Sequence, residues 1–216
     1  MLKGDCPIAA RSLWVSDITY IRLQEGFCYL SLVTDAYSRK IVGWCLGDSL
    51  QACHTEKALR MAIDDSLEKG HSLAGLIHHS DRGIQYACSE YTKLLKEHDC
   101  LISMTENGDP LENAMAERVN GILKQEWLHN YTFDTIEEVY PRIQKIIKLY
   151  NTQRPHSSIG MKTPEMMHEG VPYVPEDYLL EQTTCSQDKK KRSSGRVLPP
   201  LAAGRSPSNE FIFKVP

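Results

Sequence analysis

Three consecutive segments rich in β-branched and aromatic residues constrain the fold of this chain most strongly. They are Leu13–Ile21, Phe27–Asp35 and Lys40–Leu46, and the connectors between them are short. Short connectors join antiparallel strands, whereas a parallel crossover needs about a dozen residues or more. We therefore predict an antiparallel meander of three strands.

Helical and strand-like segments alternate after the meander. The segment His54–Gly70 is predicted to be a helix whose apolar residues near helical spacing are Ala58, Met61, Ala62 and Leu67. Two further strands are predicted at Leu73–His78 and Cys100–Met104, with a helix starting at Ser89 between them. This order of elements is that of a mixed α/β fold.

Three more helices are predicted in the C-terminal half. The first is capped by Asp109 and opened by Pro110. The second runs from about residue 135 to 150, where Pro141 is expected to kink or break it. The third is short, with Thr163 as its cap.

Charge divides the chain into an acidic body and a basic tail. Residues 1–182 hold 18 of the 25 Lys and Arg residues but 26 of the 28 Asp and Glu residues. From about residue 183 the sequence is basic, aperiodic and rich in Pro, Gly and Ser, which predicts disorder. The tail is either a solvated extension or a segment that grips DNA. The acidic body can bind DNA only through local basic patches or through metal ions.

No apolar run approaches the roughly 20 residues needed to span a bilayer, and the N-terminus lacks the apolar core of a signal peptide. We therefore expect an intracellular protein without a membrane partner. The seven cysteines include no C-x-x-C pair, so neither a disulfide framework nor a structural zinc site is expected.

Three acidic residues stand out by their positions. Asp17 lies within the first predicted strand, Asp81 lies just past the fourth, and Glu117 lies one to two turns into a helix. Carboxylates from different elements can bracket two Mg²⁺ ions about 4 Å apart, an arrangement that serves phosphodiester chemistry. Two plainer interpretations stay open on spacing alone: Asp81 can be a turn residue before Gly83, and Glu117 a surface residue of its helix.

Five separated blocks carry a family resemblance. They read LWVSDITYI, LSLVTDAYSRKIVGW, HHSDRGIQY, GDPLENAMAERVNGILKQE and YNTQRPHSSIGMKTPEMM. Together they resemble the integrase-type catalytic core of the insertion-sequence-3 transposase family, which has a ribonuclease-H-like fold. The 35 residues between Asp81 and Glu117 match the family's D-D-35-E signature. The resemblance implies an N-terminal lead (1–10), a catalytic core (11–170) and a C-terminal extension (171–216).

The resemblance also implies a chemistry. Asp17, Asp81 and Glu117 would be the catalytic residues and would hold two Mg²⁺ or Mn²⁺ ions. Water, and then a DNA 3′-hydroxyl, would attack a phosphodiester, so that DNA is cut and then joined. Two alternatives are a ribonuclease-H-like nuclease that cuts without joining, and a truncated, non-catalytic copy that binds DNA or full-length transposase.

Four further residues are candidates for DNA contacts. Lys124 corresponds to the family's basic residue seven positions after the glutamate, and it shares a helix face with Glu117 and Gly121. Gly121 removes a side chain, so DNA could approach the helix there. Asn113, one turn before Glu117, and Gln85, in the block after Asp81, are the other two.

His78 and His79 invite a zinc interpretation, but no Cys or His partner lies at zinc spacing. We expect them instead to pack in the core or to hydrogen-bond to Asp81.

Expected partners are DNA, as transposon ends and target, and a second copy of the chain. An upstream helix-turn-helix protein is a further candidate, because the family's N-terminal recognition region does not precede the first strand here. The expected location is the bacterial cytoplasm, in association with the nucleoid.

Overall fold

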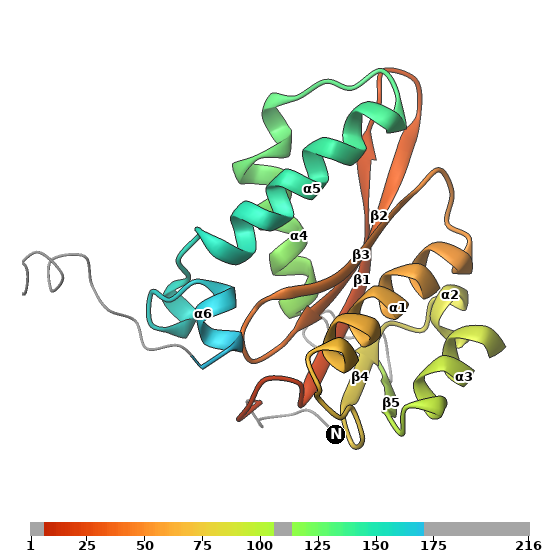
Figure 1. Cartoon of the computed structure of the whole chain (residues 1–216). Coiled ribbons are helices and arrows are strands. Elements are labelled where there is room, and N and C mark those ends of the chain that lie inside the picture. The colour runs from red at the N-terminus through yellow and green to blue at the C-terminus, as the bar shows by residue number, and fades with distance from the viewer. Residues whose placement is uncertain (1–6, 106–113, 171–216) are drawn as a thin grey trace, which may run out of the picture. The chain divides into compact units, whose positions relative to one another are not determined.

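A five-stranded mixed sheet forms the centre of the structure, which is a computed structural model that describes residues 7–105 and 114–170 (Figure 1). The meander is confirmed: β1 (Leu13–Arg22), β2 (Phe27–Asp35) and β3 (Ile41–Gly47) pair antiparallel. The strands β4 (Ile77–Ser80) and β5 (Leu101–Met104) extend the sheet in parallel on the other side of β1. The strand order is β3-β2-β1-β4-β5.

The fourth strand begins later than predicted. We expected Leu73–His78, but Leu73 to Leu76 form a turn closed by a hydrogen bond from the Leu76 amide to the Leu73 carbonyl. Gly75 has φ +82° within this turn, a conformation that glycine adopts without steric cost. The strand therefore starts after the turn and ends directly before Asp81.

Helices cover both faces of the sheet (Figure 1). One face carries α1 (Ala52–Glu68), the short α2 (Ile84–Ala87) and α3 (Ser89–Glu97) over a buried cluster. The other carries α4 (Ala114–Glu126) and α5 (Ile136–Thr152) over a second cluster. The central strands serve both clusters because successive side chains point to opposite faces. No helix within the described ranges is long and apolar enough to cross a membrane.

The buried face of α1 differs from the predicted one. Ala58 and Ala62 are buried as expected, but Met61 is 41% exposed and Leu67 is 43% exposed. Leu59 and Ile63 take their places. Both buried pairs, 58/62 and 59/63, are four residues apart, so they form one continuous stripe toward the sheet, whereas Met61 and Leu67 lie beside that stripe.

Two other helix predictions have different outcomes. The helix α5 continues through the exposed Pro141 and is not broken there, although this proline cannot donate a hydrogen bond to the carbonyl four residues earlier. The short helix α6 (Pro164–His168) is capped as predicted, since the Thr163 hydroxyl accepts a hydrogen bond from the Met166 amide. The predicted cap of α4 at Asp109 and Pro110 lies outside the described residues.

A buried polar network ties α6 to the turn between β2 and β3. Asp35 accepts hydrogen bonds from the Ser38 hydroxyl at 2.8 Å and from the Arg11 amide at 2.7 Å. His168 Nδ1 lies 2.9 Å from the same hydroxyl. Burial acts to raise the pKa of Asp35, but the hydrogen bonds from His168, Ser38 and Arg11 lower it overall. Asp35 thus anchors the hairpin between β2 and β3.

The close approach of α1 to β3 gives a stability prediction. A Cβ at Gly43 would collide with the Ala58 carbonyl and crowd Ala62, so we expect Gly43→Ala to lower the free energy of unfolding by about 1–3 kcal/mol. Urea denaturation measures this change. The matched control is Gly121→Ala, whose added Cβ meets nothing within 4 Å and which should stabilise α4 by about 0.5–1 kcal/mol. A Gly43→Ala protein as stable as the parent would contradict the packing.

Candidate active site

The pairing of β1 with β4 brings two of the predicted carboxylates together. The parallel register runs from Leu13 opposite Ile77 to Val15 opposite His79. Continuing the same offset by two residues places Asp17 beside Asp81, which follows directly after β4. Neighbouring strands lie about 4.8 Å apart, so the two acids are neighbours across the end of this ladder.

The connections that follow β1 and β4 also diverge at this position. After β1 the chain continues to β2 on one side, and after β4 it continues to β5 on the other. Parallel strands whose connections diverge leave a crevice beyond their carboxyl ends, where ligands bind in open α/β sheets. Asp17, in the middle of β1, and Asp81 lie where the shorter strand β4 ends.

The helix α4 joins the site through Asn120. Its Nδ2 donates a 2.7 Å hydrogen bond to Asp17 Oδ2, and the residue is only 6% exposed. Glu117 lies one turn earlier on the same helix and is exposed. Our sequence analysis missed Asn120. Its signal was a polar residue next to Val119 on the buried face of α4, because a buried amide needs a hydrogen-bonding partner.

The pKa of Asp17 reflects its surroundings, including the two other carboxylates. Burial is the main reason that the pKa of Asp17 rises to about 6, and the charges of Asp81 and Glu117 raise it further. Hydrogen bonds from the Ile18 amide and from Asn120 act in the opposite direction. Such a group of like charges is stabilised by a cation placed between its members.

The carboxylates are not closed around a common centre. Among the described residues, no three His, Cys, Asp or Glu side chains lie close enough together to hold a metal ion. The donors themselves suit a hard divalent cation, since Mg²⁺ prefers carboxylate oxygens and keeps several waters. In this structure Asp81 and Glu117 are thus near enough to Asp17 to affect its pKa, but the three acids do not share a metal-binding position.

The turn after β4 fixes Asp81. Its Oδ1 accepts a 2.9 Å hydrogen bond from the Gly83 amide, so the residue does close a turn, as the plainer interpretation held. A Cβ added to Gly83 would lie 2.9 Å from that same oxygen and 2.8 Å from Gln85 Oε1. Gly83 thus keeps open the space that the carboxylate occupies.

The other predicted DNA contacts are placed in part. Lys124 Nζ lies 3.9 Å from the centroid of the Tyr20 ring, a cation–π contact worth about 0.5–1 kcal/mol at an exposed site. Burial lowers the pKa of Lys124, and the charge of Asp17 opposes this effect. Gln85 is half-buried on α2. Asn113 lies outside the described residues.

His78 and His79 are buried on β4. His78 Nε2 lies 2.8 Å from the Ser16 hydroxyl and 2.9 Å from the Tyr91 hydroxyl. Burial lowers the pKa of His78 to about 3, so its ring is neutral. His79 Nδ1 lies 2.9 Å from the Ser103 hydroxyl. These contacts place both histidines in the packing between strands and helices.

Comparison with known proteins connects this geometry to a family. Residues 8–110 match a family described as "Integrase core domain", and residues 98–164 match a second family of the same description. The chain belongs to the integrase core family. Within it, the relatives identify the insertion-sequence-3 type of transposase, which confirms the resemblance seen in the sequence.

The relatives come from bacterial insertion elements. An uncharacterized 31 kDa protein of insertion element IS600 from Shigella sonnei is 38% identical over 76% of this chain and 59% of its own length. The transposase for IS904 from Lactococcus lactis is 37% identical, covering 73% of this chain and 61% of its own length. Transposase InsF for IS3A from Escherichia coli is 35% identical, over 70% and 52%. The chain thus spans about three fifths of the length of the first two relatives.

Solved structures confirm the fold. The simian T-cell lymphotropic virus intasome in complex with PP2A regulatory subunit B56 gamma matches with a TM-score of 0.64 at 18% identity, over 79% of this chain and 59% of that one. The HTLV-2 integrase catalytic core domain in complex with magnesium matches with a TM-score of 0.58 at 19% identity, over 74% and 98%. The mixed sheet flanked by helices is therefore the ribonuclease-H-like fold that we expected.

The raised pKa of Asp17 predicts how stability depends on pH. The folded protein keeps the proton of Asp17 up to about pH 6, whereas the unfolded chain loses it near 3.8, so folding becomes less favourable as pH rises between these values. In a chelator at pH 7.5, we expect Asp17→Asn to raise the free energy of unfolding by roughly 1–3 kcal/mol. Urea denaturation from pH 4 to 8 measures both effects. A variant less stable than the parent at pH 7.5 would contradict the raised pKa of Asp17.

Proposed function

We propose that this chain is the catalytic domain of a DNA transposase, which cuts and joins DNA strands with the help of divalent metal ions. The observation that carries the proposal is the pairing of β1 with β4, whose register places Asp17 beside Asp81, while Asn120 on the helix that carries Glu117 hydrogen-bonds to Asp17. Relatives named as transposases support it, as does the structural neighbour from HTLV-2, an integrase catalytic core domain in complex with magnesium.

Asp17, Asp81 and Glu117 would hold two Mg²⁺ or Mn²⁺ ions. When bound, such ions activate a nucleophilic oxygen and stabilise the leaving oxygen of an in-line displacement. The chain's own residues prepare the donors for this task. Asn120 fixes one oxygen of Asp17, and the Gly83 amide fixes one oxygen of Asp81. Each aspartate therefore presents a defined orientation to the crevice.

Cationic side chains near the crevice would receive the DNA backbone. Lys124 is the first of these, since Asp17 is close enough to affect its pKa. A phosphate bound by Lys124 would place the neighbouring phosphodiester near the carboxylates. Asn113, Gly121 and Gln85 are further proposed contacts, and an open space beside Gly121 would admit the backbone.

Further partners belong to the same proposal. They are the ends of the element and its target as DNA, a second copy of the chain, and an upstream helix-turn-helix protein. Titles of the structural neighbours name an intasome and dimeric and trimeric integrase cores, which supports oligomerisation. The reaction would take place on the nucleoid in the bacterial cytoplasm.

One observation favours a second candidate, a non-catalytic copy that binds DNA or full-length transposase. The described carboxylates do not form a group ready to hold a metal ion. A catalytic domain that assembles its site only with DNA and metal present would share this feature in the free state, so an activity measurement has to decide.

The deciding experiment is a Mg²⁺-dependent strand-transfer assay with DNA ends of the parent element. Asp81→Asn and Glu117→Gln should each reduce transfer more than about a hundredfold, because each removes a charged donor from the site. Asp64→Asn is the matched control, since Asp64 is exposed on α1 over the other face of the sheet and should not matter.

The outcomes separate the three functions. Transfer that is lost in both variants and kept in the control supports the transposase. Metal-dependent cleavage without joining would indicate the nuclease. Binding of DNA with neither reaction, in a folded parent chain, would indicate the non-catalytic copy.

Gly83 provides a more subtle test of the site. An added Cβ meets only the ends of two flexible side chains, Asp81 and Gln85, so we expect Gly83→Ala to change the free energy of unfolding by less than about 1 kcal/mol. The same Cβ displaces the Asp81 carboxylate, so strand transfer should fall at least about tenfold. Unfolding curves and transfer rates measured on one preparation check the pair of expectations. Full activity in a stable variant would show that the turn does not position Asp81.

A further inference from the structure

A groove of about 340 Å³ runs beside the candidate active site, between the end of β1 and the connection from α4 to α5. Its polar and aromatic lining consists of Tyr20, Arg22, Lys124, His129, Tyr131 and Phe133. We propose that this groove binds unpaired bases at the end of a DNA strand whose scissile phosphate lies at the carboxylates. This inference rests on the proposed function and adds a binding site for bases to it.

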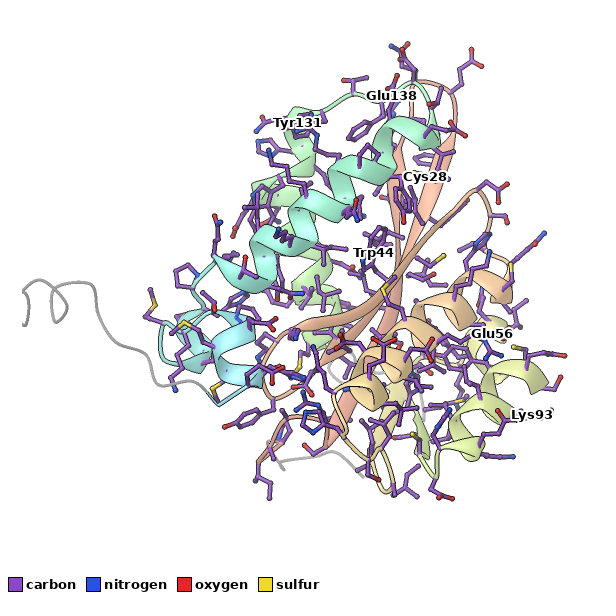
Figure 2. All side chains as sticks on the ribbon, viewed as in Figure 1. Cys28, Trp44, Glu56, Lys93, Tyr131 and Glu138 are labelled. Carbon is purple, nitrogen blue, oxygen red and sulfur yellow. The ribbon has the colours of Figure 1, made fainter. Side chains whose placement is uncertain are left out.

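Exposed aromatic rings gather at this groove. Tyr20 is 58% exposed and Tyr131 is 41% exposed, whereas most aromatic side chains contribute large buried areas. Phe27, 49% exposed, packs its ring edge-on against Tyr20 at 5.3 Å. Tyr131 stacks on Phe133 and lies on the α4–α5 connection (Figure 2). These contacts with neighbours hold the exposed rings of Tyr20 and Tyr131 in place at the groove.

The charge of the groove selects an anionic ligand. Arg22, Lys124 and His129 line it, and none of the described lining residues is acidic. The Arg142 guanidinium lies 4.2 Å from the Tyr131 ring centroid and adds a further cation nearby. This is a local excess in a chain that holds 28 acidic and 25 basic residues. Single-stranded DNA combines phosphates with flat bases, and proteins bind it with basic grooves and aromatic rings.

Two elements lead from the carboxylates into the groove. Tyr20 follows Asp17 by three residues on β1, a rise of about 10 Å. Lys124 follows Glu117 by seven residues on α4, also about 10 Å. Three steps of stacked bases cover a similar length at about 3.4 Å each. The groove therefore lies within about three nucleotides of the phosphodiester that the site would cut.

In the free protein, the Lys124 ammonium and the Tyr20 ring contact each other, so neither is available to a nucleotide until this contact opens. The ammonium lies over the ring at 3.9 Å, a contact that is weak at an exposed position. A DNA end supplies a phosphate for the ammonium and a base for the ring, so both side chains exchange one partner for a better one. The pair is thus pre-positioned for a nucleotide.

The test compares two DNA probes with the full chain in a chelator, which prevents cleavage. One probe is a duplex with three unpaired 3′ nucleotides that include 2-aminopurine, and the other is the same duplex with a blunt end. We expect the wild type to prefer the overhang and to quench 2-aminopurine fluorescence by stacking. Tyr20→Leu and Tyr131→Leu should each weaken overhang binding about tenfold, equivalent to about 1.4 kcal/mol, and leave blunt-end binding unchanged.

Three control variants identify the cause. Tyr140→Leu should change nothing, because Tyr140 is 51% exposed on α5 but packs against Trp44 outside the groove. Tyr20→Phe keeps the ring and should bind as the wild type does, which excludes an effect of misfolding. Lys124→Ala should weaken both probes and reduce the salt dependence of binding by about one counterion.

Three results would contradict the proposal that the groove binds unpaired bases. These are equal affinity of the wild type for both probes, unchanged overhang binding in the two leucine variants, and equal losses for overhang and blunt ends. The strand-transfer assay with Asp81→Asn reports separately on the proposed function. Unchanged overhang binding in the leucine variants, together with intact metal-dependent transfer, rejects the groove and keeps the transposase.

Discussion

The hydrogen bond from Asn120 to Asp17 is the contact on which the geometry of the site depends. It joins α4 to β1, the central strand of the sheet. The acceptor, Asp17, lies two residues beyond Val15, the last β1 residue that pairs with β4. Apolar packing of Val119, Ile122 and Leu123 holds α4 against the sheet but is not directional. The amide supplies the direction, because a buried donor tolerates only a narrow range of positions for its acceptor.

The candidate active site lowers the stability of the free protein, and apolar packing elsewhere in the fold opposes this effect. A half-buried aspartate close to two other carboxylates favours protonation, so ionised Asp17 opposes folding near neutral pH. Two apolar clusters on opposite faces of one sheet provide the opposing stability. The same strand β1 contributes Trp14 to one cluster and Ile21 to the other, with Asp17 between them. Function is thereby placed on the most constrained strand of the molecule, where a carboxylate cannot drift away from its neighbours.

Local patterns in the sequence predicted most of the fold, and the failures have local causes. The meander followed from β-branched runs and short connectors, and the Thr163 cap followed from side-chain chemistry. The predicted start of β4 was wrong because the buried, apolar Leu73 and Leu76 anchor a turn. The pattern of apolar residues does not distinguish such a turn from the beginning of a strand. The predicted face of α1 was wrong at Met61 and Leu67, because spacing alone does not say which residues beside Ala58 and Ala62 face the sheet. Contacts between distant segments decide both cases.

The same distinction applies to the site. The positions of Asp17, Asp81 and Glu117 made them candidates without any coordinates, and the family resemblance of their motifs decided between the catalytic and the plainer interpretations. The sequence analysis missed Asn120 and Tyr20, since each acquires its role only from a partner on another element. The partner is Asp17 for the Asn120 amide and Lys124 for the Tyr20 ring. Residues that perform chemistry carry their own signature in the sequence, whereas residues that position them do so through tertiary contacts. The positioning residues therefore have to come from the structure, and they determine whether three well-spaced acids act as one site.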